Sequence, residues 1–585
     1  MCRLVLLSLL LLPSAAQARV DKDVVYGMRS GLALLMDVHY PDRSNGRGIV
    51  FIPGSGWHAP LEYSATPLKE SGFAKLWAPP LVKAGYTVFV INHRAAPRFQ
   101  HPAALEDAQR AVRFVRAHAV QYGIDPNRIG GVGGSSGGHL IAMLGVADAP
   151  GNPDSRDPVE RESGKLQVIL ARAAPTNLTK APGASQASYM GLRLHERDGA
   201  DTPEFQRYWE ASPAAHASPD DAPFLLIHGD ADDRVPYERS VEFQDLLTQM
   251  GVEAELLRVP GGGHGASFPG AKNPPNYLGA MVSWFDRKLA DPKAKPGTPA
   301  KPAPPSPKVE RDVVFGMVSG GALLMDVYRP EKPNGFAVLH ITGSGWHSSL
   351  SPGAAQQKAS AQVKVFGLPL VEAGYTVFAV NHRTAPWHKY PAQLEDVERA
   401  VRFIRHNAAR WGVDPERLGG VGGSSGGHLT AMLGLHDGDG DPDDPDPVNR
   451  LSAKLQCILP WAPPVDLIAM NGQYGNPTFA SWLGMRLMAN DKKTTAQYRM
   501  YHDASPIHLV SKDDPPTLII HGDADEGVPI AQSQALAAKL KAVGVPVEVI
   551  PVPGGGHGAQ FPGKRSDSPD YIGAMVEWFD KYLKR

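Results

Sequence analysis

Cysteine is scarce in this chain, which has only Cys2 and Cys457 among its 585 residues. A fold stapled by disulfides is therefore excluded, and stability must come from large apolar cores. Charge of either sign is not in excess, because the formal net charge is −1 and the sequence pI is about 7.1. The chain thus lacks the electrostatic footprint of a nucleic-acid-binding protein or of one that binds an anionic membrane, and no nucleic-acid partner is expected.

Apolar runs long enough to span a bilayer are also missing. The most apolar stretch is Leu4 to Leu12, which follows the basic Arg3 and precedes the small-residue site Ala16-Gln17-Ala18. This pattern predicts a secretory signal peptide over residues 1–18, cleaved after Ala18. We therefore expect a periplasmic or secreted protein with no integral membrane segment after cleavage, in which Cys457 is the single remaining cysteine.

The chain contains one long unit twice. Asn92-His93-Arg94 recurs as Asn381-His382-Arg383, an offset of 289 that holds through Leu178 and Leu467. At the next matching pair, Gly191 and Gly484, the offset is 293, so the second copy carries four extra residues between Leu467 and Gly484. The period is far too long for a solenoid and indicates duplication of a whole domain.

A proline-rich segment, residues 291–308, separates the two copies and holds seven prolines among Ala and Lys. It predicts a semi-rigid spacer that could extend over about 50 Å. We therefore expect a signal peptide at 1–18, a first domain at 19–290, a linker at 291–308 and a second domain at 309–585.

Short apolar strands alternate with amphipathic helices in each copy. The runs at 49–52 and 87–91 have the composition of strands buried on both faces, and 103–118 has a single apolar face. Further strands are expected at 168–171, 224–227 and 253–259, and a last helix at 278–289. This alternation predicts an α/β fold with a mostly parallel, doubly wound sheet and a site at the carboxyl ends of the strands.

An identical stretch of eleven glycine-rich residues occurs at 130–140 and 419–429, preceded by a strand signal and followed by an apolar helical run. The pattern Gly-x-Ser-x-Gly between a strand and a helix is typical of a nucleophile elbow, where glycine leaves room for a sharp turn. Two adjacent serines satisfy the spacing in each copy, Ser135 and Ser136, then Ser424 and Ser425. The spacing alone does not choose between them.

A serine hydroxyl needs a base, normally a histidine that is oriented by a carboxylate. In the first copy, a strand leads into His228-Gly229-Asp230-Ala231-Asp232-Asp233, and the next strand leads into a glycine-rich turn at His264. The second copy repeats both motifs at 521–529 and 553–558. The chain order Ser, Asp, His is that of a hydrolase triad. Asp230, Asp232 and Asp233 all remain candidates for the acid on spacing alone.

Acyl transfer also requires hydrogen-bond donors for an oxyanion. The loop after the early strand reads Pro53-Gly54-Ser55-Gly56-Trp57 in the first copy and Thr342-Gly343-Ser344-Gly345-Trp346 in the second. Small residues there allow backbone N–H groups to face the site. Trp57 and Trp346 are candidates for substrate-binding walls.

Together these motifs make each copy resemble the bacterial carboxylesterases of the α/β-hydrolase superfamily, especially the group similar to acetyl xylan and feruloyl esterases. The resemblance covers nearly all of both copies and implies two tandem α/β-hydrolase domains. The elbow of that group implies Ser135 and Ser424 as nucleophiles. Its acid and histidine motifs imply Asp232 and Asp525 as the acids and His264 and His557 as the bases.

The oxyanion loop departs from the family pattern His-Gly-Gly-Gly-Trp. Pro53 and Thr342 stand in the histidine position, and a serine replaces one glycine in each copy. Because donation there is by backbone, the resemblance still implies the N–H groups of these oxyanion-hole residues: Ser55, Gly56 and Ser136 in the first copy, and Ser344, Gly345 and Ser425 in the second.

Regions 179–221 and 469–513 resemble the variable cap that sets substrate choice in this superfamily, and they diverge between the copies. The acidic run 437–444 suggests a calcium loop, but Pro442 stands where an EF-hand needs glycine, so a solvated loop is favoured. His139 and His428 follow the elbows and have either a substrate contact or a packing role at the start of a helix.

These features predict an exported serine esterase with two sites, acting on a small-molecule or polysaccharide ester without a metal or organic cofactor. Acetyl or feruloyl esters of plant polysaccharide come from the resemblance alone. Two other hypotheses stay open. One is a serine peptidase of the same fold, and the other is a binding module in which one or both copies are inactive.

Overall fold

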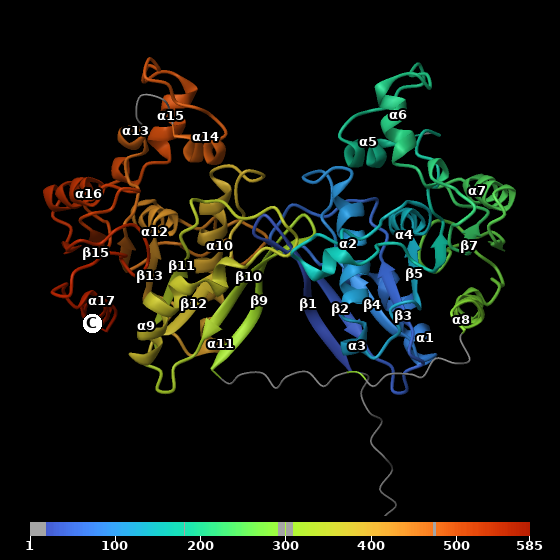
Figure 1. The fold of residues 1–585 in the computed structure, drawn as a ribbon, viewed down its shortest axis with the longest axis horizontal. Helices are drawn as coiled ribbons and strands as arrows, with labels where there is room; N and C mark the ends of the chain where they lie inside the picture. The colour runs from blue at the N-terminus through green and yellow to red at the C-terminus, as the bar shows by residue number, and fades with distance from the viewer. Residues whose placement is uncertain (1–18, 181, 291–298, 300–307, 472–475, 585) are drawn as a thin grey trace, which may run out of the picture. The chain divides into compact units, whose positions relative to one another are not determined.

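The computed structural model describes residues 19–180, 182–290, 299, 308–471 and 476–584 (Figure 1). The predicted signal peptide and nearly all of the predicted linker lie outside the described residues. The chain divides into two compact units, Met1–Tyr26 with Leu35–Ala59 and Pro67–Lys301, and Gly27–Leu34 with Pro60–Thr66 and Pro302–Arg585. The units follow the two sequence copies except for the short segments Gly27–Leu34 and Pro60–Thr66, which group with the second.

The strands of the first copy are hydrogen-bonded in the order β1-β2-β4-β3-β5-β6-β7-β8. Strand β2 pairs antiparallel with β4, and from β4 to β8 every neighbouring pair is parallel. The bounds of these strands are Val20–Arg29 (β1), Leu32–His39 (β2), Gly48–Ile52 (β3), Thr87–Ile91 (β4), Ile129–Gly134 (β5), Val168–Arg172 (β6), Phe224–Gly229 (β7) and Ala254–Val259 (β8).

The second copy repeats this order as β9-β10-β12-β11-β13-β14-β15-β16. Its strands are Val309–Val318 (β9), Gly321–Tyr328 (β10), Ala337–Ile341 (β11), Thr376–Val380 (β12), Leu418–Gly423 (β13), Cys457–Trp461 (β14), Thr517–Gly522 (β15) and Val547–Val552 (β16). The order and the antiparallel second strand are those of the α/β-hydrolase fold, so this part of the predicted fold class is confirmed.

Helices cover both faces of the strands in each copy and also lie beyond their carboxyl ends. In the first copy they are Gly72–Lys83 (α1), Ala103–Ala117 (α2), Ala119–Tyr122 (α3), Ser136–Val146 (α4), Ala184–Met190 (α5), Pro203–Glu210 (α6), Glu238–Gln249 (α7) and Tyr277–Lys288 (α8). In the second they are Leu368–Glu372 (α9), Ala392–His406 (α10), Ala408–Trp411 (α11), Ser425–Leu435 (α12), Leu467–Met470 (α13), Pro477–Leu483 (α14), Ala496–Asp503 (α15), Ala531–Ala542 (α16) and Tyr571–Leu583 (α17). Among the described residues, none of these helices has the length and apolar character needed to cross a membrane.

The core of the first copy lies between the sheet and helices α1 and α8. Trp77 of α1 and Trp284 of α8 are fully buried there against β3 to β8. Helices α2 and α4 pack on each other and α4 on β5 and β6. The buried apolar face of α2 includes Leu105, Ala108, Val112 and Val115, as its periodicity predicts. In Figure 1, α5 and α6 lie above the carboxyl ends of the strands.

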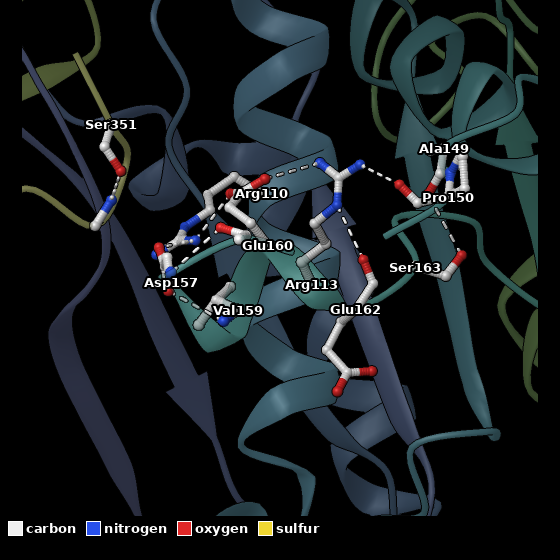
Figure 2. A network of polar contacts seen from close by, with 12 residues as sticks. Arg110, Arg113, Ala149, Pro150, Asp157, Val159, Glu160, Glu162, Ser163 and Ser351 are labelled. Carbon is white, nitrogen blue, oxygen red and sulfur yellow. Dashed lines mark hydrogen bonds and ion pairs between the residues drawn. The ribbon is translucent and has the colours of Figure 1, made fainter. Parts of the chain in front are cut away.

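Arginines of α2 hold the loop that joins α4 to β6 (Figure 2). Arg110 pairs with Asp157 at 2.6 Å and with Glu160 at 2.8 Å, and the Arg113 guanidinium donates to the carbonyl oxygen of Glu162 at 3.1 Å. Buried charges of this kind are tolerated because they are paired and hydrogen-bonded. The second copy keeps the pairing through Arg399 and Asp446 at 2.6 Å, next to the acidic run 437–444. No group of three or more His, Cys, Asp or Glu residues arranged to hold a metal ion occurs in the described part of the chain.

The predicted bounds match strands β3, β4, β6, β7 and β8 and helices α2 and α8 to within about two residues. The predicted strand signal before the elbow lies in β5, whereas α4 begins at Ser136, four residues before the predicted helical run at 140–144. The hairpin of β1 and β2 was not predicted, because an antiparallel pair at the start of a parallel sheet does not follow from strand and helix alternation. The second copy also differs at the position of α1, where a π-helical segment, Val363–Gly367, precedes the shorter α9.

Candidate active site

Ser135 occupies the sharp turn between β5 and α4. Its backbone has φ 55° and ψ −125°, a conformation that a non-glycine residue adopts only where the surroundings enforce it. Its N–H donates to the carbonyl oxygen of Arg172 at 2.8 Å. A Cβ on Gly133 would lie 2.2 Å from the Gly137 oxygen, and one on Gly137 would lie 2.1 Å from the Ile52 oxygen. Glycine is therefore required at both flanking positions.

The side chain of Ser135 faces a histidine from the loop after β8. His264 Nε2 lies 3.0 Å from Ser135 Oγ, and His264 Nδ1 lies 2.7 Å from Asp232 Oδ2. With Nδ1–H donating to the carboxylate, Nε2 is left as the acceptor for the serine hydroxyl. The structure thus brings Ser135, Asp232 and His264 together, and it places Ser135 rather than Ser136 against the histidine.

The second copy repeats this arrangement. Ser424 has φ 53° and ψ −123° between β13 and α12. His557 Nε2 lies 2.9 Å from Ser424 Oγ, and His557 Nδ1 lies 2.7 Å from Asp525 Oδ2. Each of the two copies therefore holds its own complete Ser-His-Asp arrangement.

The neighbouring acidic residues have other partners. Asp230 accepts hydrogen bonds from Arg258 Nε at 2.7 Å and from the Gly261 N–H at 2.6 Å, so it closes the turn after β7. Asp233 is exposed. Only Asp232 of the three candidates contacts the histidine.

Asp232 is held in its ionised form. Burial by itself would raise its pKa, but hydrogen bonds from His228, His264 and the N–H groups of Val235 and Arg234 together hold the pKa of Asp232 well below its ordinary value. The two backbone N–H groups each donate to Oδ1 at 2.9 Å. Asp525 has the same set of partners, which likewise lower its pKa. An ionised carboxylate can orient the imidazole and stabilise its protonated form.

His228 supports Asp232, the acid of the first site. It is part of the acid motif, but no role was assigned to it from the sequence. It is fully buried at the end of β7, with Nδ1 2.7 Å from Ser240 Oγ and Nε2 3.4 Å from Asp232 Oδ2. His521 lies in the same way beside Ser533 and Asp525. The sequence signal for this role was the repeated motif His-Gly-x-x-Asp, in which His228 and His521 stand four residues before the acid in both copies.

The predicted oxyanion loop reaches the elbow through a serine hydroxyl. The Ser55 N–H donates to Ser136 Oγ at 2.9 Å, and the Ser344 N–H donates to Ser425 Oγ at 2.8 Å. The amides of Ser55 and Ser344 are therefore engaged with the elbow. Gly56, with φ +66°, follows next, and among the hydrogen bonds of the described residues its N–H donates to none. Ser136 begins α4, where the N–H groups have no partner in a preceding turn.

Trp57 and Trp346, the candidate substrate walls, are mostly packed against the cap. Trp57 is only 2% exposed, donates its indole N–H to His139 Nδ1 at 3.2 Å and stacks on Tyr189 of α5 with ring centres 4.7 Å apart. Trp346 stacks on Trp482 of α14 at 4.0 Å. These tryptophans connect the oxyanion loop with the cap helices.

His139 and His428 are buried packing residues. His139 accepts from Trp57 at Nδ1 and lies 2.7 Å from the Ala211 oxygen at Nε2, which assigns the neutral tautomer with the proton on Nε2. Burial lowers the pKa of His139 to about 3 and that of His428 to about 4. Of the two roles considered from sequence, the structure supports packing.

Two hollows meet at Ser135. The larger, about 970 Å³, opens between the start of α5 and the loop 231–235 and is lined by Ser135, His264 and Trp57. The smaller, about 300 Å³, lies between the oxyanion loop and the turn after His264, and Phe73 and Arg172 line it. Sequence reasoning assigned no role to Phe73 or Arg172. A comparison of the two copies would have found them, because Gln362 and Trp461 replace them in the second.

A family model described as BD-FAE matches residues 36–247 and 325–540. The chain belongs to the BD-FAE family. The match falls once in each copy, so it confirms the resemblance to this group of esterases inferred from the motifs. Both elbows and both acid motifs of this BD-FAE protein lie within the matched residues, and His264 and His557 follow shortly after them.

Individual relatives agree with the family match. The esterase LipC of Mycobacterium tuberculosis is 29% identical over 265 residues, which cover 42% of this chain and 59% of LipC. The acetylxylan esterase of Xylanibacter ruminicola is 24% identical over 293 residues, or 49% of this chain and 53% of that enzyme. The match thus spans about half the length of each of these relatives.

Among solved structures, a truncated carbohydrate esterase from gut microbiota is 30% identical with a TM-score of 0.40, covering 48% of this chain and 99% of that one.

Proposed function

We propose that this protein is an exported serine carboxylesterase with two catalytic units, each an α/β-hydrolase domain. The observation that carries the proposal is the hydrogen-bonded series Ser135, His264 and Asp232, repeated by Ser424, His557 and Asp525. Membership in the BD-FAE family and the esterase names of its relatives support ester bonds as the target.

Acylation begins with the serine hydroxyl. His264 Nε2 accepts the proton of Ser135 Oγ as the oxygen attacks the carbonyl carbon of the ester. The resulting imidazolium is stabilised by ionised Asp232 and then donates the proton to the departing alcohol oxygen. The acyl group stays on Ser135 as an ester.

Deacylation uses the same groups in reverse. A water molecule donates its proton to His264 Nε2 while attacking the acyl carbon, and Ser135 Oγ recovers the proton when the carboxylic acid leaves. In both steps the negative charge develops on the carbonyl oxygen. We propose the backbone N–H groups of Gly56 and Ser136 as the donors, because the amide of Ser55, the third predicted donor, is already bonded to Ser136 Oγ.

The substrate side of the proposal rests on the relatives. The relative from Xylanibacter ruminicola is named an acetylxylan esterase, so acetyl esters of plant polysaccharide are proposed as substrates. Feruloyl esters are proposed on the motif resemblance alone. Export rests on the signal peptide over residues 1–18, with cleavage after Ala18. Sequencing the N-terminus of the exported protein should find Arg19 first, and an intact Met1 would contradict it.

The test is hydrolysis of 4-nitrophenyl acetate by the mature protein and by Ser135→Ala, Ser424→Ala and the double variant. Each single variant should keep the rate of the other site, and the double variant should lose at least about 10³-fold. A double variant with undiminished activity would show that these serines are not the nucleophiles.

A peptidase is the second candidate, since an uncharacterized peptidase of Bacillus subtilis, YuxL, is 27% identical over 169 residues, which cover 28% of this chain and 23% of that protein. The same variants should therefore also be tested on aminoacyl 4-nitroanilides. Amide cleavage without ester hydrolysis would favour the peptidase. If neither substrate class reacts and a fluorophosphonate labels neither serine, a binding module becomes the better hypothesis.

A further inference from the structure

The last residue of the strand after the elbow differs between the copies. It is Arg172 at the end of β6 and Trp461 at the end of β14, two positions related by the offset of 289. Each residue accepts the N–H of the proposed nucleophile through its backbone oxygen, at 2.8 Å for Ser135 and 2.9 Å for Ser424. The backbone role is thus shared, and the difference lies in the side chains.

Arg172 is a buried cation beside the first site. Its side chain is 2% exposed, one guanidinium nitrogen donates to the Gly265 oxygen, and its Cζ lies 4.3 Å from the centre of the Phe268 ring. Its Nε is buried and has no hydrogen-bond partner in the described part of the chain. Burial lowers the pKa of Arg172 to about 10, although the charge of Asp232 raises it, so the guanidinium stays protonated at neutral pH.

Arg172 lines the smaller hollow next to Ser135 and His264. The other residues that line it are glycines, Ser55, Phe73 and Ala266, all of them neutral. At about 300 Å³, this hollow suits the smaller of the two groups attached to the ester carbonyl. A fixed positive charge in a partly enclosed, low-dielectric space attracts an anion strongly and disfavours a purely apolar group.

The second copy has no charge at this position. The Trp461 ring lies over the elbow, since a Cβ on Gly423 would be 1.7 Å from it, and it stacks on Phe366 with ring centres 5.3 Å apart. In the first copy the ring that lies over the equivalent Gly134 belongs instead to Phe73. Gln362 replaces Phe73 and turns to the backbone of Gly343, with hydrogen bonds of 2.8 and 3.0 Å.

We infer that Arg172 makes the first site selective for esters whose smaller group carries a carboxylate, while the second site, which has the uncharged Trp461 at this position, lacks that selectivity and prefers neutral esters. The carboxylate would lie in the smaller hollow and pair with the guanidinium through charge-assisted hydrogen bonds. The two copies would then act on differently charged esters. This inference rests on the proposed esterase function.

A purely structural role for Arg172 is the alternative, because its bond to the Gly265 oxygen holds the residue that follows His264. The two roles make different predictions. A specificity role changes the ratio between charged and neutral substrates. Loss of the Gly265 contact alone would disturb His264 and reduce the hydrolysis of both kinds of ester by the same factor.

The experiment uses the Ser424→Ala protein to report the first site and Ser135→Ala to report the second, with the double variant as the blank. kcat/KM is measured for 4-nitrophenyl hemisuccinate against 4-nitrophenyl butyrate, a charged and a neutral acyl group of equal length. Arg172→Met and Arg172→Lys are added to the first-site protein, and Trp461→Met to the second-site protein as the matched control.

The charged-to-neutral ratio should be at least about tenfold higher at the first site than at the second. Arg172→Met should remove that difference, Arg172→Lys should restore part of it, and Trp461→Met should leave the second-site ratio in place. The inference is overturned if both sites have the same ratios, or if Arg172→Met lowers charged and neutral esters alike. If the Ser424→Ala protein hydrolyses no ester above the blank, the proposed function of the first site fails and the inference fails with it.

Discussion

The backbone N–H of Ser55 donates a hydrogen bond of 2.9 Å to Oγ of Ser136. This bond gives separate roles to the two adjacent serines of the elbow. Ser135 faces His264, whereas Ser136 joins the oxyanion loop to the start of α4. The same division holds for Ser424 and Ser425 in the second copy.

Ser136→Ala should therefore weaken the first site without abolishing it. The loop loses one neutral hydrogen bond, which contributes about 1 kcal/mol, so kcat should fall by about fivefold with little change in KM. The measurement is ester hydrolysis in a Ser424→Ala background, with Ser135→Ala beside it. Equal loss in both variants would mean that Ser136 is as indispensable as Ser135, which contradicts the separate roles. Loss in Ser136→Ala alone would make Ser136 the nucleophile.

Asp232→Asn should reduce kcat of the first site by about 10²- to 10⁴-fold, because an amide cannot stabilise the imidazolium and favours the wrong tautomer of His264. Asp230→Asn is the matched control, since Asp230 bonds Arg258 and Gly261 in the turn and does not contact His264. The kcat of Asp230→Asn should stay within a few-fold of that of the protein with Asp230 intact. If Asp230→Asn lost most of its activity and Asp232→Asn kept its own, Asp230 would be the acid of the triad and Asp232 would not.

His340→Phe should stabilise the second copy. His340 in β11 is fully buried with no hydrogen-bond partner at either ring nitrogen within the described residues, and the first copy has Phe51 at this position. Removing an unpaired buried polar group should raise the free energy of unfolding at pH 8 by about 1–3 kcal/mol. Phe51→His should lower it in the first copy, and denaturant unfolding measures both.

The pH dependence of this effect has a definite sign. Burial lowers the pKa of His340 to about 4, below its ordinary value of 6.5. Between these values the unfolded chain binds a proton and the folded chain does not, so the folded state loses stability as the pH falls from 6.5 to about 4. The loss amounts to about 3 kcal/mol at most. The stabilisation by His340→Phe should therefore be larger at pH 5 than at pH 8, and a smaller gain at pH 5 would contradict it.

Gly137→Ala should destabilise the first copy by about 3 kcal/mol and abolish activity at Ser135, because its Cβ would lie 2.1 Å from the Ile52 oxygen and backbone must move. Gly72→Ala at the start of α1 is the control, since no atom lies within 4 Å of its added Cβ and alanine favours helix. Thermal unfolding and ester hydrolysis in the Ser424→Ala background test both variants. Normal folding and activity of Gly137→Ala would refute the steric requirement at the elbow.

Motif order, repetition and apolar periodicity were sufficient for the sequence to determine the α/β class, the duplicated unit and the motifs that supply the serine, the acid and the histidine of each triad. These features depend on local propensity and chain order. A strand such as Thr87–Ile91 is buried throughout and apolar after its first residue, and only glycine fits beside Ser135 in the elbow.

The tertiary structure decided which of the candidate residues take part in the site, because those choices depend on contacts between segments that are distant in sequence. It separated Ser135 from Ser136 and Asp232 from Asp230, because each choice turns on which atom lies within hydrogen-bonding distance of a histidine 32 to 129 residues away. It also buried Trp57 and His139 against the cap and placed Arg172 beside the proposed nucleophile. Spacing along the chain does not encode those distances, since they arise only when the carboxyl ends of β5, β6, β7 and β8 come together at one edge of the sheet.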